Sequence, residues 1–371
     1  MKEEIVGRLR GLAREAGLQA LIAMSPENFA YSMGVLIPSQ LTVRSRHALG
    51  IIPVEGPDPT IIAVDIEEPV ARERAWYGEI RTYNEFTQDP MNLLADCLAE
   101  LGLGTGRVGI EVDYLPARAR DALAARLPHA SIEAADGFFL TARQRKTAGE
   151  IERIRIIGRL AAEVLEGALR EARPGMTEAD LGRRITGAYL GGGGDRLTML
   201  VVGSGERSTL ANAAPTRRVL QPGDLLRVDV IGTREYYYSD FCRTAVVGKA
   251  SAEQERTWGL LFSARDRLIE DLRPGVGTGE LYRSYAAFMA EHGLPVINFV
   301  GHGLGLTLHE EPYVGRYGST ILEEGMTLCI EPMCFLPGRG GYQVEDEILI
   351  TGDGCEVLTA ESWSRKLFEI S

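Results

Sequence analysis

The spacing of apolar and polar residues predicts alternating strands and helices over about the first 135 residues. Four apolar runs are each long enough for one strand, namely residues 18–24, 47–54, 59–66 and 108–114. Asp89 followed by Pro90 predicts the N-cap and first position of a helix that reaches Leu101. Strands and helices that alternate in this way are typical of a small α/β domain.

A polar stretch near Leu140 predicts a domain boundary, so the expected domains are residues 1–139 and 140–371. The second domain begins with a long helical pattern over residues 150–172 and has two or three long helices in all. Two paired strand patterns predict antiparallel hairpins, residues 225–232 with 236–248 and residues 326–335 with 342–351. Two similar helix-plus-hairpin units suggest an internal pseudo-repeat, which would place the two hairpins near each other.

The composition excludes several classes of protein. The chain has 371 residues, 45% hydrophobic and 25% charged, which is ordinary for a globular protein of two or three domains. A net charge of −12 disfavours nucleic acid as a partner, because phosphate backbones are bound mainly through clustered Lys and Arg. No apolar run is long enough to span a bilayer, and the opening residues have the spacing of an amphipathic helix rather than of a signal peptide. We therefore expect a cytoplasmic protein with no membrane partner.

The cysteines give no sign of a special role. They are five in number, at irregular spacings: Cys97, Cys242, Cys329, Cys334 and Cys355. An odd number without a paired motif indicates neither a disulfide framework nor a paired zinc site. We expect them to be reduced packing residues.

Each predicted hairpin carries acids where a core-facing strand should carry aliphatic residues. These acids are Asp229, Asp240, Glu331 and Glu345. An ionised carboxylate on a buried strand is strongly unfavourable unless it is paired or bound to a cation. Any one of them alone would ordinarily be a salt bridge at the rim of a sheet. Four of them point to a metal cluster, with His302 as a further ligand.

A glycine-rich stretch, FVGHGLGLTLHEEP at residues 299–312, holds two of the five histidines, His302 and His309. Taken alone, the pair could be polar turn residues. Glycine buries little, however, and a neutral imidazole offers a ligand or proton-transfer nitrogen. Together with the four acids, this pattern predicts that something small binds beside the loop.

The segments that carry these residues resemble the pita-bread metallopeptidases, the family of prolidase, aminopeptidase P and methionine aminopeptidase. The resemblance runs from about Arg143 to Leu358. It rests on four motifs in matching order and spacing: VDVIGTREYYYSDFCRT, GHGLGLTLHEEP, EGMTLCIEP and GGYQVEDEILI. It implies an α/β two-domain protein, with an N-terminal creatinase-like α/β domain and a C-terminal pita-bread α+β domain that contains a curved antiparallel sheet.

The resemblance also implies a ligand set for two divalent metal ions. The ligands would be Asp229, Asp240, His302, Glu331 and Glu345, with Asp240 and Glu345 bridging the ions. Four carboxylates and one imidazole suit Mn²⁺ or Co²⁺, with Zn²⁺ or Fe²⁺ as alternatives. The glycines around His302 would then let the backbone come close to the ions.

Two residues would take part in the chemistry that the family implies. Glu331 would accept the proton of the water between the metals as well as bind metal. His309 would hydrogen-bond the substrate carbonyl or stabilise the oxyanion, its alternative role being to orient a metal ligand. The implied reaction is hydrolysis of an amide bond in a small peptide or other small amide.

The N-terminal half narrows the resemblance further. The stretch LQALIAMSPENFAYSMGV resembles the opening of the N-terminal domain in prolidases and aminopeptidases P, which methionine aminopeptidases commonly lack. In those relatives a homodimer brings the partner's N-terminal domain over the active site. By analogy we expect a homodimer here.

Three positions depart from the family pattern. Asn212 stands where a histidine is usual, Gln343 where an arginine is common, and Met333 where the family has glycine. Asparagine can hydrogen-bond but cannot titrate, so a proton relay near the scissile bond would be altered. We expect Asn212 and Gln343 to contact the substrate and to affect specificity rather than hydrolysis itself.

Three functions remain open from the sequence. The first is an Xaa-Pro dipeptidase or aminopeptidase P-like peptidase, which the full ligand set and the two-domain length favour. The second is a hydrolase of a small non-peptide C–N bond, creatinase-like or ectoine hydrolase-like, which Asn212 and Gln343 favour. The third is a non-catalytic pita-bread binding module, which the complete ligand set disfavours.

Overall fold

The structure is a computed structural model that describes residues 1–359 and 365–371. The chain divides into two compact units, Met1–Arg143 and Gln144–Ser371. No helix in these described ranges is long and apolar enough to cross a membrane.

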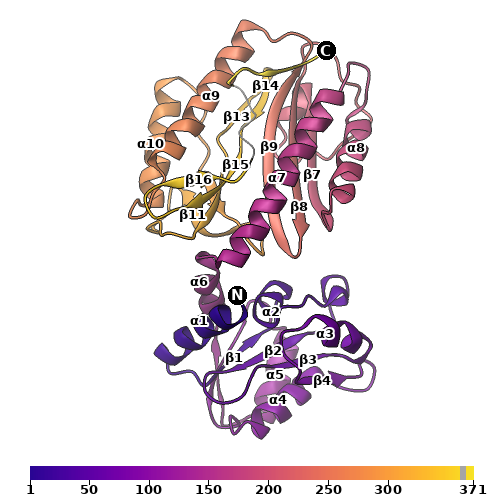
Figure 1. Ribbon diagram of the computed structural model, residues 1–371, viewed down its shortest axis with the longest axis vertical. Coiled ribbons are helices and arrows are strands. Elements are labelled where there is room, and N and C mark those ends of the chain that lie inside the picture. Colours follow the sequence, from indigo (N-terminus) through magenta and orange to yellow (C-terminus); the bar gives the residue numbers. More distant parts are fainter. Residues whose placement is uncertain (360–364) are drawn as a thin grey trace. The chain divides into compact units, whose positions relative to one another are not determined.

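The N-terminal unit is built on a six-stranded mixed sheet with strand order β4-β3-β2-β1-β5-β6 (Figure 1). Its strands are β1 Ala20–Ala23, β2 Leu49–Pro53, β3 Thr60–Val64, β4 Ile80–Tyr83, β5 Arg107–Ile110 and β6 Ser131–Ala134. Its α-helices are α1 Lys2–Glu15, α2 Pro26–Met33, α3 Glu68–Arg74, α4 Pro90–Glu100, α5 Ala117–Arg126 and α6 Asp136–Gln144, with 3₁₀ turns η1 Pro38–Leu41 and η2 Asp65–Glu67.

Local signals account for much of this unit. Helix α4 begins where the sequence predicts, because the Asp89 side chain accepts a hydrogen bond from the backbone N–H of Met91. The four apolar runs form β1, β2, β3 and β5, and their buried side chains pack with α4 in one core. The edge strands β4 and β6 went unpredicted, because both are short and carry polar residues along half their length.

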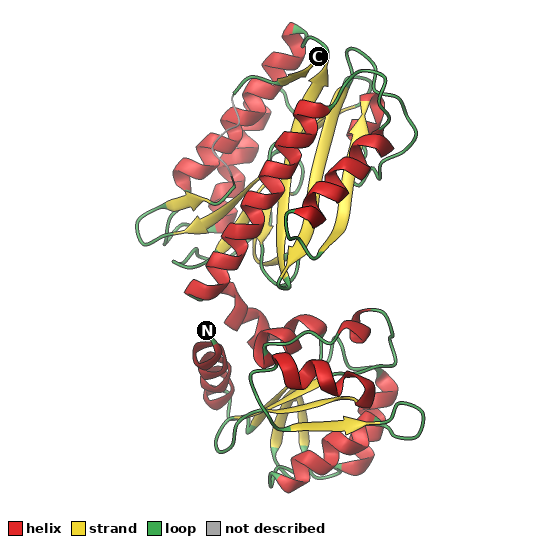
Figure 2. Ribbon diagram, turned by 45° about the vertical axis from the view of Figure 1, so that its right-hand side comes forward, coloured by secondary structure: helices red, strands yellow, loops and turns green. Residues whose placement is uncertain are grey.

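The C-terminal unit contains two mainly antiparallel sheets and a two-stranded ribbon (Figure 2). The first sheet has the order β17-β9-β8-β7, with β7 Arg196–Ser204, β8 Leu225–Arg234, β9 Tyr237–Val247 and β17 Phe368–Ile370, the last of which runs parallel to β9. The second has the order β11-β10-β12-β15-β16, with β10 Phe299–Gly303, β11 Glu310–Gly315, β12 Thr327–Ile330, β15 Asp346–Ile350 and β16 Cys355–Val357. The ribbon pairs β13 Met333–Leu336 with β14 Gly340–Gln343.

Two pairs of helices cover these sheets. Helices α7 Ala148–Glu171 and α8 Glu178–Gly191 lie on the β7–β9 sheet, and 3₁₀ turn η3 Gly205–Thr209 follows β7 (Figure 1). Helices α9 Ala252–Asp271 and α10 Thr278–Glu291 share a second core with β10, β12 and β15. Capping boxes begin α7, α8 and α9, so local sequence fixes where these helices start. Each pair of helices precedes a group of antiparallel strands.

The first predicted hairpin is confirmed, and the second is divided. β8 and β9 pair along their whole lengths, from Leu225 opposite Val246 to Arg234 opposite Tyr237. The second hairpin breaks after Ile330, where Pro332 has no N–H to give to a ladder. The residues before the break form β12, which pairs with β15, and the residues after it form β13, which pairs with β14 in the separate ribbon. The chain is therefore free to bend at this break.

Candidate metal centre

The two aspartates face the same side of the β8/β9 hairpin. Asp229 lies opposite Cys242, and Asp240 lies opposite Ile231. Because Asp240 and Cys242 are two residues apart on one strand, their side chains point to the same face, which is also the face of Asp229. The eleven residues that separate Asp229 from Asp240 in the sequence thus span the turn of the hairpin and bring the two side chains to the same face of the sheet.

The two glutamates sit at the break in the second hairpin. Glu331 follows β12, and its N–H donates to the carbonyl of Val300 on β10 at 2.9 Å. Glu345 precedes β15, and its N–H donates to the carbonyl of Cys242 on β9 at 3.1 Å. At the break, the backbone of Glu331 thus hydrogen-bonds to one sheet and the backbone of Glu345 to the other. These bonds bring the two predicted hairpins together, as the pseudo-repeat suggested.

His302 lies on β10 with only 1% of its surface exposed, and its hydrogen bonds leave one nitrogen for a ligand role. Its Nδ1 lies 3.0 Å from the carbonyl oxygen of Gly303, which can only accept, so Nδ1 carries the proton. Its Nε2 lies 3.5 Å from Asp240 Oδ2 and 3.3 Å from Glu331 Oε1. Burial lowers the pKa of His302, but these two carboxylates outweigh it and raise the pKa to about 10.

The carboxylates are crowded, buried and short of hydrogen-bond donors. Within the described part of the chain, three of their buried oxygens have no hydrogen-bond partner: Asp229 Oδ1, Asp240 Oδ1 and Glu345 Oε1. Burial raises the pKa of Asp229 and of Glu345 well above the ordinary range, and the charge of Asp240 raises both further. Burial also raises the pKa of Glu331. This donor set fits divalent cations, which would balance the negative charge that the protein alone leaves uncompensated.

The second histidine, His309, stacks on the first. The two ring centroids are 3.8 Å apart and the planes meet at 11°. His309 is exposed, whereas His302 beneath it is buried. Burial of part of the ring and the charge of His302 lower the pKa of His309 to about 4, which keeps the ring neutral at neutral pH. His309 is thus a neutral hydrogen-bonding group that a ligand can reach from solvent.

The loop of His309 is held by a buried ion pair. Glu310, the next residue, lies 3.2 Å from Lys146 Nζ, and both side chains are almost fully buried. Glu310 Oε1 also accepts a 2.9 Å hydrogen bond from the backbone N–H of Thr307. The carboxylate therefore closes the turn that carries His309 and ties it to the start of the C-terminal unit.

The structure gives the glycines beside His302 a role that the sequence did not suggest. A Cβ added to Gly301 would lie 2.4 Å from the carbonyl oxygen of Cys329, and one added to Gly303 would lie 2.5 Å from that of Glu311. Both contacts are shorter than any real Cβ tolerates. These glycines let β10 approach its two neighbouring strands, and that approach sets the position of His302 in the sheet.

Gln343, expected at the substrate, faces the carboxylates. Its Nε2 donates to Glu345 Oε2 at 3.2 Å and to Glu331 Oε2 at 3.4 Å. Its Oε1 accepts a 2.7 Å hydrogen bond from Nη1 of Arg227, a buried residue of β8 that we did not single out from the sequence. Arg227 stands two residues before Asp229, and that spacing on a strand is the signal that could have found it.

Arg227 also holds the segment that contains Asn212. Its guanidinium donates to the backbone carbonyls of Ser208 at 3.1 Å and Ala211 at 2.7 Å, and to that of Leu210. Asn212 follows directly and is exposed. One buried arginine therefore connects the carboxylates, through Gln343, with the segment on which Asn212 lies.

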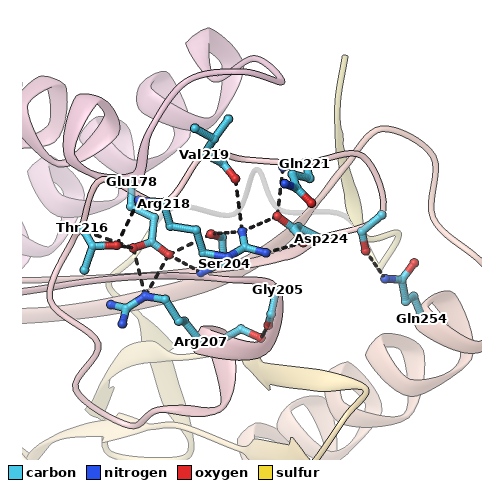
Figure 3. Close-up of polar contacts among 12 residues, drawn as sticks. Glu178, Ser204, Gly205, Arg207, Thr216, Arg218, Val219, Gln221, Asp224 and Gln254 are labelled. Carbon is cyan, nitrogen blue, oxygen red and sulfur yellow. Dashed lines mark hydrogen bonds and ion pairs between the residues drawn. The ribbon is translucent and has the colours of Figure 1, made fainter.

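A second anchor fixes the far end of this segment (Figure 3). Glu178 at the start of α8 is fully buried and accepts hydrogen bonds from the backbone and side chain of Ser204 and of Thr216. Arg207 pairs with the same carboxylate at 3.1 Å. Burial raises the pKa of Glu178, but the hydrogen bonds from Thr216 and Ser204 outweigh it and leave the pKa below its ordinary value.

A second buried arginine that we did not single out from the sequence, Arg243, connects strands β9 and β15. Arg243 Nη1 donates to the carbonyls of Cys242 and Glu345, and Arg243 Nη2 pairs with Asp346 at 2.7 Å. Asp346 also accepts from Arg265 Nε at 2.7 Å. These contacts join β9 to β15 at the level of the acids.

Comparison with known proteins identifies the family. Residues 152–352, more than half of the chain, match metallopeptidase family M24. The chain belongs to this family. Residues 6–145 match the creatinase/prolidase N-terminal domain, so both parts of this M24 protein have named counterparts.

Individual relatives agree with this assignment. An Xaa-Pro dipeptidase of Pyrococcus furiosus is 31% identical over 217 residues, which are 58% of this chain but only 62% of the relative, less than two thirds of its length. A probable dipeptidase PepE of Mycobacterium tuberculosis is 28% identical over 356 residues, 95% of this chain and 93% of that one. A solved structure of an Xaa-Pro dipeptidase from Bacillus anthracis has a TM-score of 0.88 and 25% identity, and the match covers 100% of both chains. These likenesses confirm the family and the two-domain architecture that the sequence motifs implied.

Proposed function

We propose that this M24 protein is a dinuclear-metal-dependent amide hydrolase, an Xaa-Pro dipeptidase or aminopeptidase P-like peptidase. One observation carries the proposal: four buried carboxylates and His302 Nε2 converge where three carboxylate oxygens have no hydrogen-bond partner in the described chain. The Pyrococcus and Bacillus relatives named as Xaa-Pro dipeptidases support a peptide substrate. Homodimer formation and a cytoplasmic location stay predictions.

The proposed metal ligands are the five that the motifs imply: Asp229, Asp240, His302, Glu331 and Glu345. Glu345 belongs to two clusters of donor atoms that could each hold an ion, one with Asp240 and His302 and one with Asp229. A carboxylate common to both clusters supports the bridging role. Oxygen-rich donors with one imidazole suit Mn²⁺ or Co²⁺.

The residues divide the chemistry between them. Divalent ions bound here would supply Lewis acidity, lowering the pKa of a water and polarising the scissile carbonyl. Glu331 would accept the proton of the attacking water as well as bind metal, and its two oxygens lie 3.3 Å from His302 Nε2 and 3.4 Å from the Gln343 amide nitrogen. His309 presents a neutral, exposed ring that can donate a hydrogen bond to the carbonyl oxygen as negative charge develops there.

A second function keeps specific support. Asn212 and Gln343 stand where peptidases of this family usually have a histidine and an arginine, and Gln343 is committed to Arg227 and the carboxylates. These departures from the family pattern favour a hydrolase of a small non-peptide C–N bond. A screen of purified protein with Mn²⁺ or Co²⁺ against Xaa-Pro dipeptides, longer Xaa-Pro peptides and cyclic or guanidino amides decides between the two, since each function predicts turnover of a different class.

The metal centre is tested separately from the substrate. Asp240→Ala and Glu345→Ala should each release at least one ion and abolish hydrolysis, because each removes a proposed bridging carboxylate. Asp353→Ala, an exposed aspartate, is the matched control and should keep both ions. Full metal content in the first two variants would refute the cluster. Glu331→Gln should lose about 10² to 10⁴ in kcat at matched metal content, because an amide cannot accept the proton.

A further inference from the structure

Two of the five cysteines lie among the proposed metal ligands. Cys329 Sγ belongs to a cluster with donor atoms of Asp240, His302 and Glu345, all within 4.8 Å of one another. Cys242 Sγ belongs to a second cluster with Asp229 and Glu345, within the same limit. Both cysteines are fully buried. Both are free and buried, as we expected from the sequence, but their sulfur atoms also lie among the donor atoms of the proposed ligands.

The strand register places both thiols on the ligand face. Cys242 lies directly opposite Asp229 in the β8/β9 pair and two residues after Asp240. Cys329 lies directly opposite His302 in the β10/β12 pair and two residues before Glu331. Opposite residues, and residues two apart on one strand, share a face of the sheet. Each cysteine side chain therefore projects from the face that carries the neighbouring ligand.

An independent observation indicates that cations belong in these clusters. The carboxylates of both clusters have buried oxygens with no hydrogen-bond partner within the described residues: Asp240 has one in the first cluster, Asp229 one in the second, and Glu345, which is in both, has one as well. The thiols do not satisfy these oxygens. Cys329 Sγ instead approaches the backbone carbonyl of Asp240, at 3.9 Å.

We propose that Cys329 and Cys242 each supply a sulfur ligand, one to each ion of the centre. This inference rests on the proposed dinuclear site and adds a thiol to each of its positions. On binding, each thiol loses its proton to water and its sulfur donates an electron pair to the ion, with no change of oxidation state. Thiolate favours Zn²⁺, Cd²⁺ and Co²⁺ over Mn²⁺, so the centre is more thiophilic than its four carboxylates and one imidazole imply.

The chain supplies matched controls. Cys334 is also fully buried, on β13, and belongs to neither cluster. Cys355 is half-buried, and its Sγ donates to the carbonyl of Ile269 at 3.4 Å. Replacing Cys334 by serine removes a buried thiol from the same unit without touching the proposed ligand set.

The test is the absorption spectrum of the full-length protein loaded with Co²⁺. A sulfur ligand produces a thiolate-to-cobalt charge-transfer band in the near ultraviolet, which carboxylate and imidazole ligands do not. We expect this band in the wild type, a weaker band in Cys329→Ser and in Cys242→Ser, none in the double variant, and an unchanged band in Cys334→Ser. A wild-type protein that binds Co²⁺ without the band overturns the proposal, and so does a band that survives in the double variant.

A competition titration gives the second readout. The ratio of Zn²⁺ to Mn²⁺ affinity should fall at least about tenfold in each serine variant, because loss of a supporting group already costs 10- to 100-fold in metal affinity. Alanine variants repeat the measurement if serine disturbs the fold. An unchanged ratio overturns the proposal. Failure of the proposed function is distinguishable from either result, since the wild type would then bind neither Co²⁺ nor Zn²⁺ at these residues.

Discussion

Arg227 fixes which way the amide of Gln343 faces. Arginine can only donate hydrogen bonds, so its 2.7 Å contact must be with the amide oxygen, and the amide nitrogen must face Glu331 and Glu345. A glutamine turned the other way would present an oxygen to two carboxylates. The arginine thus keeps a donor directed at two of the proposed metal ligands without contacting them itself.

Replacing Arg227 by methionine should weaken metal binding about 10- to 100-fold, which is the usual effect of losing a group that orients a ligand. Arg227→Lys should recover only part of the loss, because one ammonium cannot replace a planar fork that reaches both Gln343 and three carbonyls. Titration of the apoprotein against a competing chelator measures the affinity. Arg339→Met, which removes an exposed arginine paired with Glu253, is the control. The same metal affinity in Arg227→Met as in Arg339→Met would contradict the positioning role of Arg227.

Features set by local sequence could be predicted from it. The cap of α4, the long helix α7 and the β8/β9 hairpin depend on residues close together in the chain. The motif order then implied the family, which the comparison confirms. The ligand roles of the acids and of His302 stay predictions, although the structure brings these residues together.

Features set by distant packing could not be predicted in this way. An arginine inside an apolar strand, such as Arg227, gives no sign of its partner 116 residues away. Cysteine packs as a small apolar residue, so the chain alone does not reveal that Cys242 and Cys329 face carboxylates. We predicted one unbroken hairpin across Pro332, because the bend depends on distant strands: carbonyls of β9 and β10 accept the N–H groups of Glu345 and Glu331.

The buried pair of Lys146 and Glu310 gives a stability prediction. Lys146→Met should destabilise the protein by about 3–5 kcal/mol, because it leaves a carboxylate buried without its cation. Lys146→Met combined with Glu310→Gln should recover much of that loss, since the amide oxygen can still accept from Thr307. Urea unfolding at neutral pH of these two variants and of Glu310→Gln alone completes a double-mutant cycle. Additive losses would show that the two side chains do not interact.

Glu178 predicts how stability depends on pH. Its folded pKa lies below the ordinary value, so the ionised carboxylate stabilises the fold at pH values above its unfolded pKa, about 4.3. This stabilisation is lost as the pH falls through the folded pKa. Glu178→Gln should therefore be about 1–3 kcal/mol less stable than the wild type at pH 7, and the difference should narrow in acid. Glu206→Gln, an exposed neighbour, is the control, and a constant difference across the pH range would contradict the prediction.

Asn212 separates the two candidate functions. The residue is exposed, and the segment around it is held by Arg227 on one side and by Glu178, through Thr216, on the other. A histidine should therefore fit at this position without disturbing the carboxylates. Unfolding midpoints and metal content equal to those of the wild type would establish that any change in rate is chemical.

If the protein is an Xaa-Pro peptidase, Asn212→His should raise kcat on Xaa-Pro dipeptides, because a well-placed titratable group contributes up to about 10² to 10⁴ in acid–base catalysis. If the substrate is a small non-peptide amide, Asn212 is a specificity contact, and the same change should lower kcat/KM on that substrate and add little on peptides. The measurement compares wild type and variant on both substrates at matched metal occupancy. A gain on Xaa-Pro peptides supports the peptidase, because the added titratable group would then act on a bound peptide. The second function would replace the peptidase assignment if Asn212→His gained no activity on Xaa-Pro peptides and lost activity on a non-peptide amide that the wild type hydrolyses well.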